Sequence, residues 1–233
     1  MNIEANIKRF EELMSKINRD GIKELLEYVN QSDFYTAPAS TRFHLACPGG
    51  LLQHSLNVYD CLIAKKSSPI WGKYLENVKE ESLILISLMH DLCKANLYTI
   101  GYKNQKTYDT NKVRAANHSQ VKHDDLGDFI WETVTKYETN DRCPLGHGEK
   151  SLALCQHFVK LNVEEIFAIR WHMGFTEEKS QYNSIGEAME RWPIVLAIHE
   201  ADLEASKLLE DTEGNKNFPV LTSKDDRDTK RCS

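Results

Sequence analysis

The sequence lacks an apolar run long enough to cross a membrane. Its longest strongly apolar stretch covers residues 83–89, whereas a spanning helix needs roughly 20 such residues. The first residues also lack the basic and then apolar pattern of a secretion signal. These absences predict a cytoplasmic protein with no membrane partner.

Closely spaced cysteine pairs are absent too. The six cysteines are scattered, and no two of them form a CxxC pair. The Cys and His residues between 143 and 157 do not have the spacing of a usual structural zinc site. Cys61, Cys93 and Cys155 fall in apolar helical stretches, where a free cysteine behaves as a small hydrophobe. We therefore expect reduced thiols that pack in the core.

An excess of positive charge is also missing, because the net charge is −6. This balance argues against broad, nonspecific nucleic-acid binding. It leaves a phosphorylated small molecule, a nucleotide or a short single-stranded nucleic acid open as partners. With 233 residues, of which 41% are hydrophobic, the chain is long enough for one domain with a sizeable core.

Apolar residues recur at helical spacing along most of the chain. This periodicity predicts helices over residues 4–17, 21–30, 51–66, 70–77, 79–93, 147–161, 163–173 and 192–210. Residues 94–142 are polar instead. Tyrosines around residues 103–106 indicate a small hairpin there, and residues 131–138 alternate in the manner of a strand.

The expected architecture is therefore mainly α. N-terminal helices (1–31) pack on a core domain (32–210), and a polar, partly β insertion (94–142) interrupts that domain. Residues 211–233 are polar and charged, which predicts a mobile tail outside the fold.

Several predicted helices carry a polar residue where an apolar one is expected. His54 lies on the same stripe as Leu51, Val58 and Leu62. The helix over residues 79–93 is apolar nearly all round and is therefore predicted to be buried, yet it contains His90 and Asp91. A buried carboxylate needs a cation or hydrogen-bond donors.

Two later helices repeat this pattern. His172 shares a side with Ala168 and Ile169, and Asp202 is the one charge on the apolar stripe of the last helix. His147 lies between two glycines in a turn that leads into a helix. A single inward histidine is more often a satisfied core residue, and a single inward aspartate is often a cap or an ion-pair partner. Four helical segments with this feature favour a shared divalent cation, for which imidazole and carboxylate are suitable ligands.

These residues resemble the motif of the HD-domain metal-dependent phosphohydrolases. The motif is read as His54, the pair His90-Asp91, and Asp202. Residues 48–58 (PGGLLQHSLNV) resemble the opening helix of these enzymes, and residues 88–94 (LMHDLCK) resemble their His-Asp segment with its trailing lysine. The resemblance covers about residues 35–210 and implies an HD-type helical bundle.

The resemblance also implies a ligand set. His54, His90, Asp91 and Asp202 would hold one metal, and His147 and His172 would hold a second, with Asp91 as the bridge. The ion would be Mn, Fe, Ni, Co or Zn.

Two branches of the family are the most similar. One is the HD-GYP phosphodiesterases, from which this chain departs in two ways. A histidine pair is expected at residues 170–173, which read RWHM here, and the GYP tripeptide is absent. Residues 43–54 also resemble the HD domain of bacterial 3′-to-5′ exoribonucleases. Those enzymes carry an N-terminal OB-type domain, whereas the predicted N-terminal helices of this chain (1–31) are too short to form one.

The predicted function is hydrolysis of a phosphoester by metal-activated water. Asp91 and Lys94 are the predicted catalytic residues, and Arg42, His44 and Lys150 are the predicted substrate-binding residues. Two alternatives stay open. One is a single-metal nucleotidase, and the other is a non-catalytic HD module that binds a nucleotide.

Overall fold

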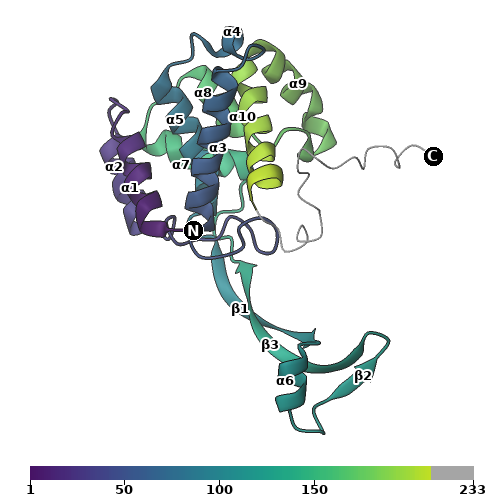
Figure 1. Ribbon diagram of the computed structural model, residues 1–233. Coiled ribbons are helices and arrows are strands. Elements are labelled where there is room, and N and C mark those ends of the chain that lie inside the picture. The colour runs from purple at the N-terminus through teal and green to yellow at the C-terminus, as the bar shows by residue number, and fades with distance from the viewer. Residues whose placement is uncertain (211–233) are drawn as a thin grey trace, which may run out of the picture.

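The computed structural model describes residues 1–210, and the predicted tail at 211–233 lies outside the described residues. The described part consists of a helical bundle from which a long β arm projects (Figure 1). This confirms the prediction of a mainly α protein with a small β insertion. Within residues 1–210, no helix has both the length and the apolar character that a membrane span requires.

Five helices make up the centre of the bundle. They are α3 (Gly50–Lys66), α5 (Glu80–Met89), α7 (His147–Phe158), α8 (Val163–Trp171) and α10 (Pro193–Glu204). Helix α5 is apolar on every side, and each of its residues from Ser82 to Met89 is buried. Asn162 and Glu165 form a capping box that starts α8, and Pro193 occupies the first turn of α10.

The N-terminal helices pack on this bundle. Helix α1 (Ile3–Met14) buries Phe10 and Met14, and α2 (Ile22–Gln31) buries Leu25, all in the same hydrophobic core as α3 and α5. Between α1 and α2, Arg19 forms two hydrogen bonds with Glu165 of α8, at 2.7 and 2.8 Å. A buried ion pair thus connects the N-terminal segment to the rest of the bundle.

Shorter elements complete the helical part. They are α4 (Gly72–Leu75), α9 (Tyr182–Arg191), the 3₁₀ turns η1 (Leu92–Lys94), η2 (Gly174–Thr176) and η3 (Lys179–Gln181), and the π-helical turn η4 (Ala205–Leu209). Helix α9 was not predicted from the sequence. Its buried apolar face consists of only Ile185, Ala188 and Met189, so it lacks the longer apolar stretches from which the other helices were predicted.

The arm is a three-stranded antiparallel sheet with the order β1-β3-β2. It comprises β1 (Tyr98–Thr107), β2 (Lys122–Asp124) and β3 (Gly127–Thr139), with α6 (Thr110–Ala115) at its far end. The predicted strand at 131–138 is part of β3, but the predicted hairpin at 103–106 is wrong. Strand β1 runs straight through these residues and pairs along its whole length with β3. The tight reversal lies between β2 and β3, where Gly127 adopts a φ of 117°.

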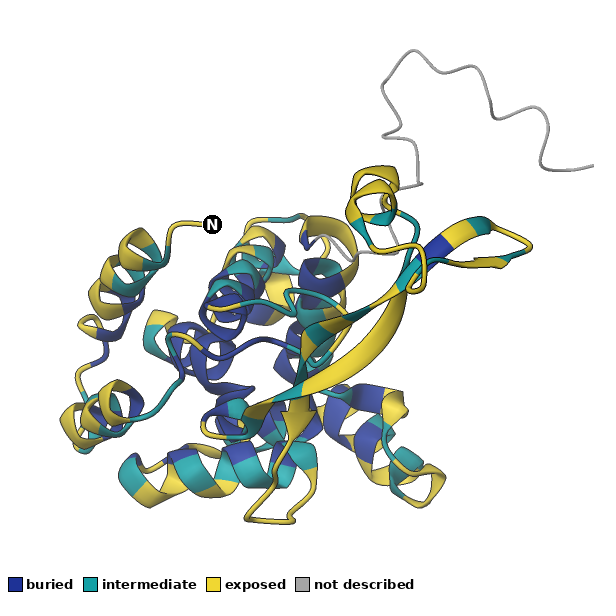
Figure 2. Cartoon of the chain, turned by 90° about the horizontal axis from the view of Figure 1, so that it is seen from below, coloured by how far each residue is buried: buried dark blue, intermediate teal, exposed yellow. Residues whose placement is uncertain are grey.

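Most of the arm is exposed, whereas the buried residues gather in the bundle (Figure 2). Strand β1 begins shortly after η1, which itself follows His90 and Asp91 at the end of α5. The arm therefore leaves the bundle beside the predicted His-Asp motif.

Candidate metal centre

All six predicted metal ligands come together in the structure. They belong to overlapping triads whose ligand atoms lie within 4.8 Å of one another: His54–His90–Asp202, His90–Asp91–His172, Asp91–Cys93–His147, and also His44–His54–Glu210. His54, His90, Asp91 and His172 are buried. The separate helices therefore meet at one cluster of His, Asp, Cys and Glu side chains that is suited to metal binding.

Each ligand comes from an end of a helix or from the turn beside it. His54 lies in the first turns of α3, His90 is the C-cap of α5, and His172 is the C-cap of α8. His147 is the first residue of α7, and Asp202 lies in the last turn of α10. The ends of these helices thus meet at the cluster. Their apolar faces pack against one another in the core, and this packing holds the ligands in place.

Close packing of α7 against α8 brings His147 and His172 together. A Cβ at Gly148 would lie 2.1 Å from the carbonyl oxygen of Arg170, so only glycine allows the start of α7 to approach the end of α8 this closely. As a result, the ring centroids of His147 and His172 lie 5.2 Å apart. His199 supports this end of α8, because its Nδ1 lies 2.7 Å from the carbonyl oxygen of His172 and donates to it.

The first group of ligand atoms surrounds Nε2 of His54. This nitrogen lies 3.3 Å from Nε2 of His90, 3.1 Å from Oδ1 of Asp202 and 3.5 Å from Oδ2 of Asp91. Nε2 of His90 is also 3.5 Å from Oδ2 of Asp91. Metal bonds of about 2.0–2.1 Å in tetrahedral geometry place ligand atoms about 3.3 Å apart. The spacing therefore fits one ion held by these four residues.

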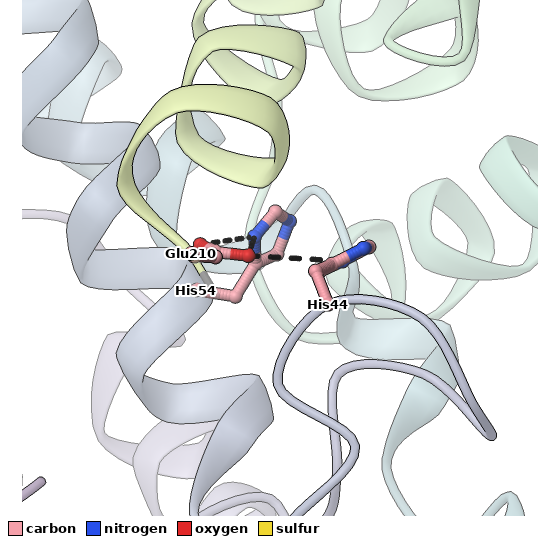
Figure 3. Close-up of side chains that lie close together, drawn as sticks. All are labelled: His44, His54 and Glu210. Carbon is pink, nitrogen blue, oxygen red and sulfur yellow. Dashed lines mark hydrogen bonds and ion pairs between the residues drawn. The ribbon is translucent and has the colours of Figure 1, made fainter. Parts of the chain in front are cut away.

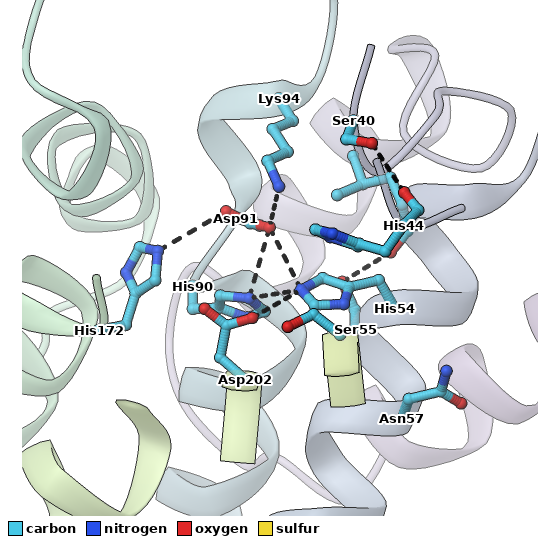
Figure 4. Close-up of polar contacts among 12 residues, drawn as sticks. Ser40, His44, His54, Ser55, Asn57, His90, Asp91, Lys94, His172 and Asp202 are labelled. Atoms are coloured by element: carbon cyan, nitrogen blue, oxygen red, sulfur yellow. Dashed lines mark hydrogen bonds and ion pairs between the residues drawn. The ribbon is translucent and has the colours of Figure 1, made fainter. Parts of the chain in front are cut away.

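A second group forms on the other side of Asp91 (Figure 4). Oδ1 of Asp91 is 2.6 Å from Nε2 of His147 and 3.6 Å from Nε2 of His172. The latter nitrogen is buried and has no hydrogen-bond partner among residues 1–210. Asp91 thus turns one oxygen to each group, as a bridging carboxylate does.

In His90 and His172, a hydrogen bond at Nδ1 orients the ring so that Nε2 faces the cluster. Nδ1 of His90 donates to the carbonyl oxygen of Ser87 at 2.8 Å, and Nδ1 of His172 donates to that of Ile169 at 2.7 Å. A neutral ring that donates from Nδ1 presents a lone pair at Nε2. The orphaned Nε2 of His172 is therefore a free ligand atom, and the residues present fit a divalent metal.

The electrostatics of the cluster attract positive charge. Burial acts to lower the pKa of His54, but hydrogen bonds and charges from Asp202 and Glu210 outweigh it and raise this pKa to about 10. Burial acts to raise the pKa of Asp91, but Lys94 and His90 hold it well below its ordinary value. Asp91 and Asp202 both stay ionised at neutral pH, because the pKa of Asp202 is also lowered.

Glu210 is a site residue that sequence reasoning missed. Its Oε1 lies 2.9 Å from Nδ1 of His54 (Figure 3). The same oxygen accepts a hydrogen bond from Asn57 at 3.0 Å. A carboxylate on the outer nitrogen of a histidine orients the ring and makes it a stronger ligand. The sequence placed Glu210 at the last position of a long helix, and no motif marks it. The π turn η4, which sequence periodicity does not predict, brings it inward.

His44 lies beside this carboxylate, as the sequence placed it near the site. Its ring is 4.9 Å from that of His54, and its Nε2 is 3.9 Å from Oε2 of Glu210. Burial, followed by the charge of His54, lowers the pKa of His44 to about 4. This imidazole is therefore neutral at physiological pH and is available as a hydrogen-bonding group at the cluster.

The other predicted catalytic and substrate residues divide into two sets. Nζ of Lys94 lies 2.6 Å from Oδ2 of Asp91, so Lys94 belongs to the cluster. Lys150 instead bonds Asp141 at 2.6 Å, and Arg42 lies over the ring of Phe43 at 5.0 Å. The structure does not bring these last two cations to the proposed ligands.

Arg42 lines a groove of about 690 Å³ between the loop at 41–48 and the base of the arm. Lys103 and Lys136 of the arm line the same groove. It contains none of the metal-ligand candidates, but its loop also carries His44. Arg42 and Lys103 thus supply positive charge to this groove, whereas Lys136 is paired with Glu138 at 2.9 Å.

No protein-family model, curated protein or solved structure matches the chain. The candidate centre is accordingly identified from the geometry of the chain itself.

Proposed function

We propose that the protein is a metal-dependent phosphohydrolase of the HD type. The observation that carries this proposal is the convergence of His54, His90, Asp91 and Asp202, which come from three helices and one turn and meet in the interior. Buried carboxylates and imidazoles in such a cluster need a cation to offset the free energy of their burial.

His54, His90, Asp91 and Asp202 would hold one ion, and His147 and His172 would hold a second with Asp91 between them. Bound there, a divalent ion lowers the pKa of water towards neutrality and neutralises charge on a phosphoryl oxygen. Manganese, iron, nickel, cobalt and zinc all suit imidazole and carboxylate ligands.

The remaining residues of the cluster supply binding and positioning. Nζ of Lys94 is 2.6 Å from Asp91, so it binds a phosphoryl oxygen next to the reacting centre as a point charge. Asp91 orients the attacking water through the carboxylate that faces both groups. His44 hydrogen-bonds the substrate from the loop at the side of the cluster.

The groove beside the loop at 41–48 supports a phosphorylated substrate. Arg42 and Lys103 line it and provide positive charge for phosphates outside the reacting bond. Lys136 also lines it but is paired with Glu138 at 2.9 Å. We infer that a nucleotide, or a fragment derived from a nucleic acid, occupies the groove while its scissile phosphate reaches Lys94.

The test is a metal analysis of the purified protein, followed by assays with phosphomonoesters, phosphodiesters and nucleotides in manganese, cobalt or nickel. The matched variants are His90→Gln and His123→Gln. His123 precedes Asp124, so it forms the other His-Asp pair of the chain, but it is exposed in β2 and pairs with Asp128. We expect His90→Gln to abolish hydrolysis and reduce bound metal, and His123→Gln to leave both unchanged.

The alternatives give different results. Two ions per chain with phosphoesterase activity support the proposal in full. One ion, with His147→Ala and His172→Ala as active as the parent protein, supports a single-metal nucleotidase. Bound metal with no hydrolysis of any compound supports a non-catalytic module. Absence of metal binding refutes the proposed centre.

A further inference from the structure

The cluster also contains a buried thiol, that of Cys93. Cys93 is 2% exposed, and its Sγ lies 3.4 Å from Nδ1 and 3.7 Å from Nε2 of His147. Its ligand atom also lies within 4.8 Å of those of Asp91 and His147. The sequence predicted a small hydrophobe at this position, but the structure places the thiol against two of the proposed ligands.

The backbone holds Cys93 in this place. Its N–H donates to Oγ of Ser151 at 3.1 Å, and that hydroxyl is buried. Ser151 lies one turn after His147 on α7, so one face of this helix presents both the hydroxyl and the imidazole. This hydrogen bond holds the turn η1 against helix α7 and keeps Sγ of Cys93 beside the ring of His147.

We propose that Cys93 is a thiolate ligand of the second metal position, together with Asp91 and His147. This inference rests on the metal centre of the proposed function and specifies its second ion. The thiolate makes this a mixed sulfur, nitrogen and oxygen site, which favours zinc, cobalt or iron over manganese or magnesium. On binding, the thiol and any proton on Nε2 of His147 release their protons to solvent.

The distances agree with such a site. Bonds of about 2.3 Å to sulfur and about 2.0–2.1 Å to nitrogen in tetrahedral geometry separate these two atoms by about 3.5 Å. Sγ of Cys93 is 3.7 Å from Nε2 of His147, which is the ring nitrogen that faces Asp91. The 2.6 Å contact of this nitrogen with Asp91 is a hydrogen bond, and a shared ion would replace it.

An independent observation points to an ion at the same place. Nε2 of His172 is buried without a hydrogen-bond partner in residues 1–210, and it faces the same oxygen of Asp91 at 3.6 Å. A ring nitrogen left unpaired in the interior costs free energy. Coordination of the second ion would satisfy it.

The experiment is a cobalt titration of the apoprotein followed by absorption spectroscopy. A thiolate ligand gives an intense sulfur-to-cobalt charge-transfer band in the near ultraviolet, which nitrogen and oxygen ligands do not give. The variants are Cys93→Ser and, as a control, Cys155→Ser, a buried thiol further along α7. We expect the band in the parent protein and in the control, and its loss in Cys93→Ser.

The same titration measures affinity. Loss of a direct ligand should weaken binding of the second cobalt by more than the roughly 10- to 100-fold that loss of an outer partner causes, whereas the first cobalt binds Cys93→Ser normally. Cobalt binding without the charge-transfer band overturns the role of Cys93 and leaves the metal centre standing. No cobalt binding by the parent protein overturns both proposals.

If Cys93→Ser does not fold, X-ray absorption of the zinc-loaded parent protein decides the question without a variant. A sulfur neighbour at about 2.3 Å from zinc supports the thiolate, and a shell of only nitrogen and oxygen at about 2.0–2.2 Å overturns it.

Discussion

The ion pair between Arg19 and Glu165 should be among the most sensitive points of the fold. Arg19 forms two hydrogen bonds with this carboxylate, and the Glu165 side chain is 1% exposed. Arg19→Met would leave the carboxylate buried, with the Asn162 backbone N–H as a remaining donor at 2.9 Å. Removing one partner of a buried pair costs about 3–5 kcal/mol. Because the Arg19 side chain keeps 16% exposure, we expect the lower end of that range.

A loss of about 3 kcal/mol lowers the melting temperature by roughly 6–12 °C in a chain of this size. The control is Lys16→Met. Lys16 pairs with Glu80 at 3.2 Å, but both side chains are more than half exposed, and such pairs are worth about 0–1 kcal/mol. Thermal and urea unfolding of both variants measures the difference. Equal stability of Arg19→Met and Lys16→Met would refute the reasoning.

The pH dependence gives a further check on the same pair. Burial acts to raise the pKa of Glu165, but hydrogen bonds from Arg19 and Ser82 outweigh it and lower this pKa. A lowered carboxyl pKa contributes stability that is present above the unfolded value of about 4.3 and is lost as the pH falls through the folded value. The stability difference between the parent protein and Arg19→Met should therefore be full at pH 7. It should shrink as the pH falls through the pKa of Glu165 in the variant, which burial without Arg19 raises, and then through the lowered pKa in the parent protein.

Three more variants test the cluster. Glu210→Gln should weaken binding of the first metal by about 10- to 100-fold in a cobalt titration, because it removes the carboxylate that orients His54; unchanged affinity would contradict this role. Lys94→Met should lower kcat/KM for a phosphate ester by about 10- to 150-fold, the equivalent of losing one charged hydrogen bond. The control Lys150→Met should leave kcat/KM unchanged, because Nζ of Lys150 bonds Asp141 in the parent protein. Similar effects of the two substitutions would refute the role of Lys94. Gly148→Ala should cost about 1–3 kcal/mol, because its Cβ meets backbone at 2.1 Å, whereas Gly186→Ala faces open space and should not destabilise; calorimetry separates the two.

Most of the proposed ligands could be predicted because they stand out against an apolar background, whereas His147 lies in a turn between two glycines. His54, His90 and Asp202 interrupt stripes that are otherwise hydrophobic, and a helical period of 3.6 residues fixes the side of the helix on which they lie. The same period predicts most of the helices of the bundle, and the expectation of a mainly α fold with a β insertion is confirmed.

What the sequence missed depends on backbone geometry that has no periodic signal. Glu210 reaches His54 through a π turn, and Cys93 reaches His147 through a 3₁₀ turn, so neither could be assigned from helical spacing. The predicted hairpin at 103–106 failed because that stretch has no glycine, whereas the actual reversal ends at Gly127. Lys150 looked free in the sequence because its partner Asp141 lies in the preceding loop, outside any helical period.

The most direct measurement of the central claim is a crystal structure of the metal-loaded protein with anomalous data at the absorption edge of the bound ion. We expect an anomalous peak among His54, His90, Asp91 and Asp202, and a second beside His147, His172 and Cys93, with Asp91 between the two. Metal-soaked crystals that show no anomalous peak within bonding distance of Asp91 would contradict the account.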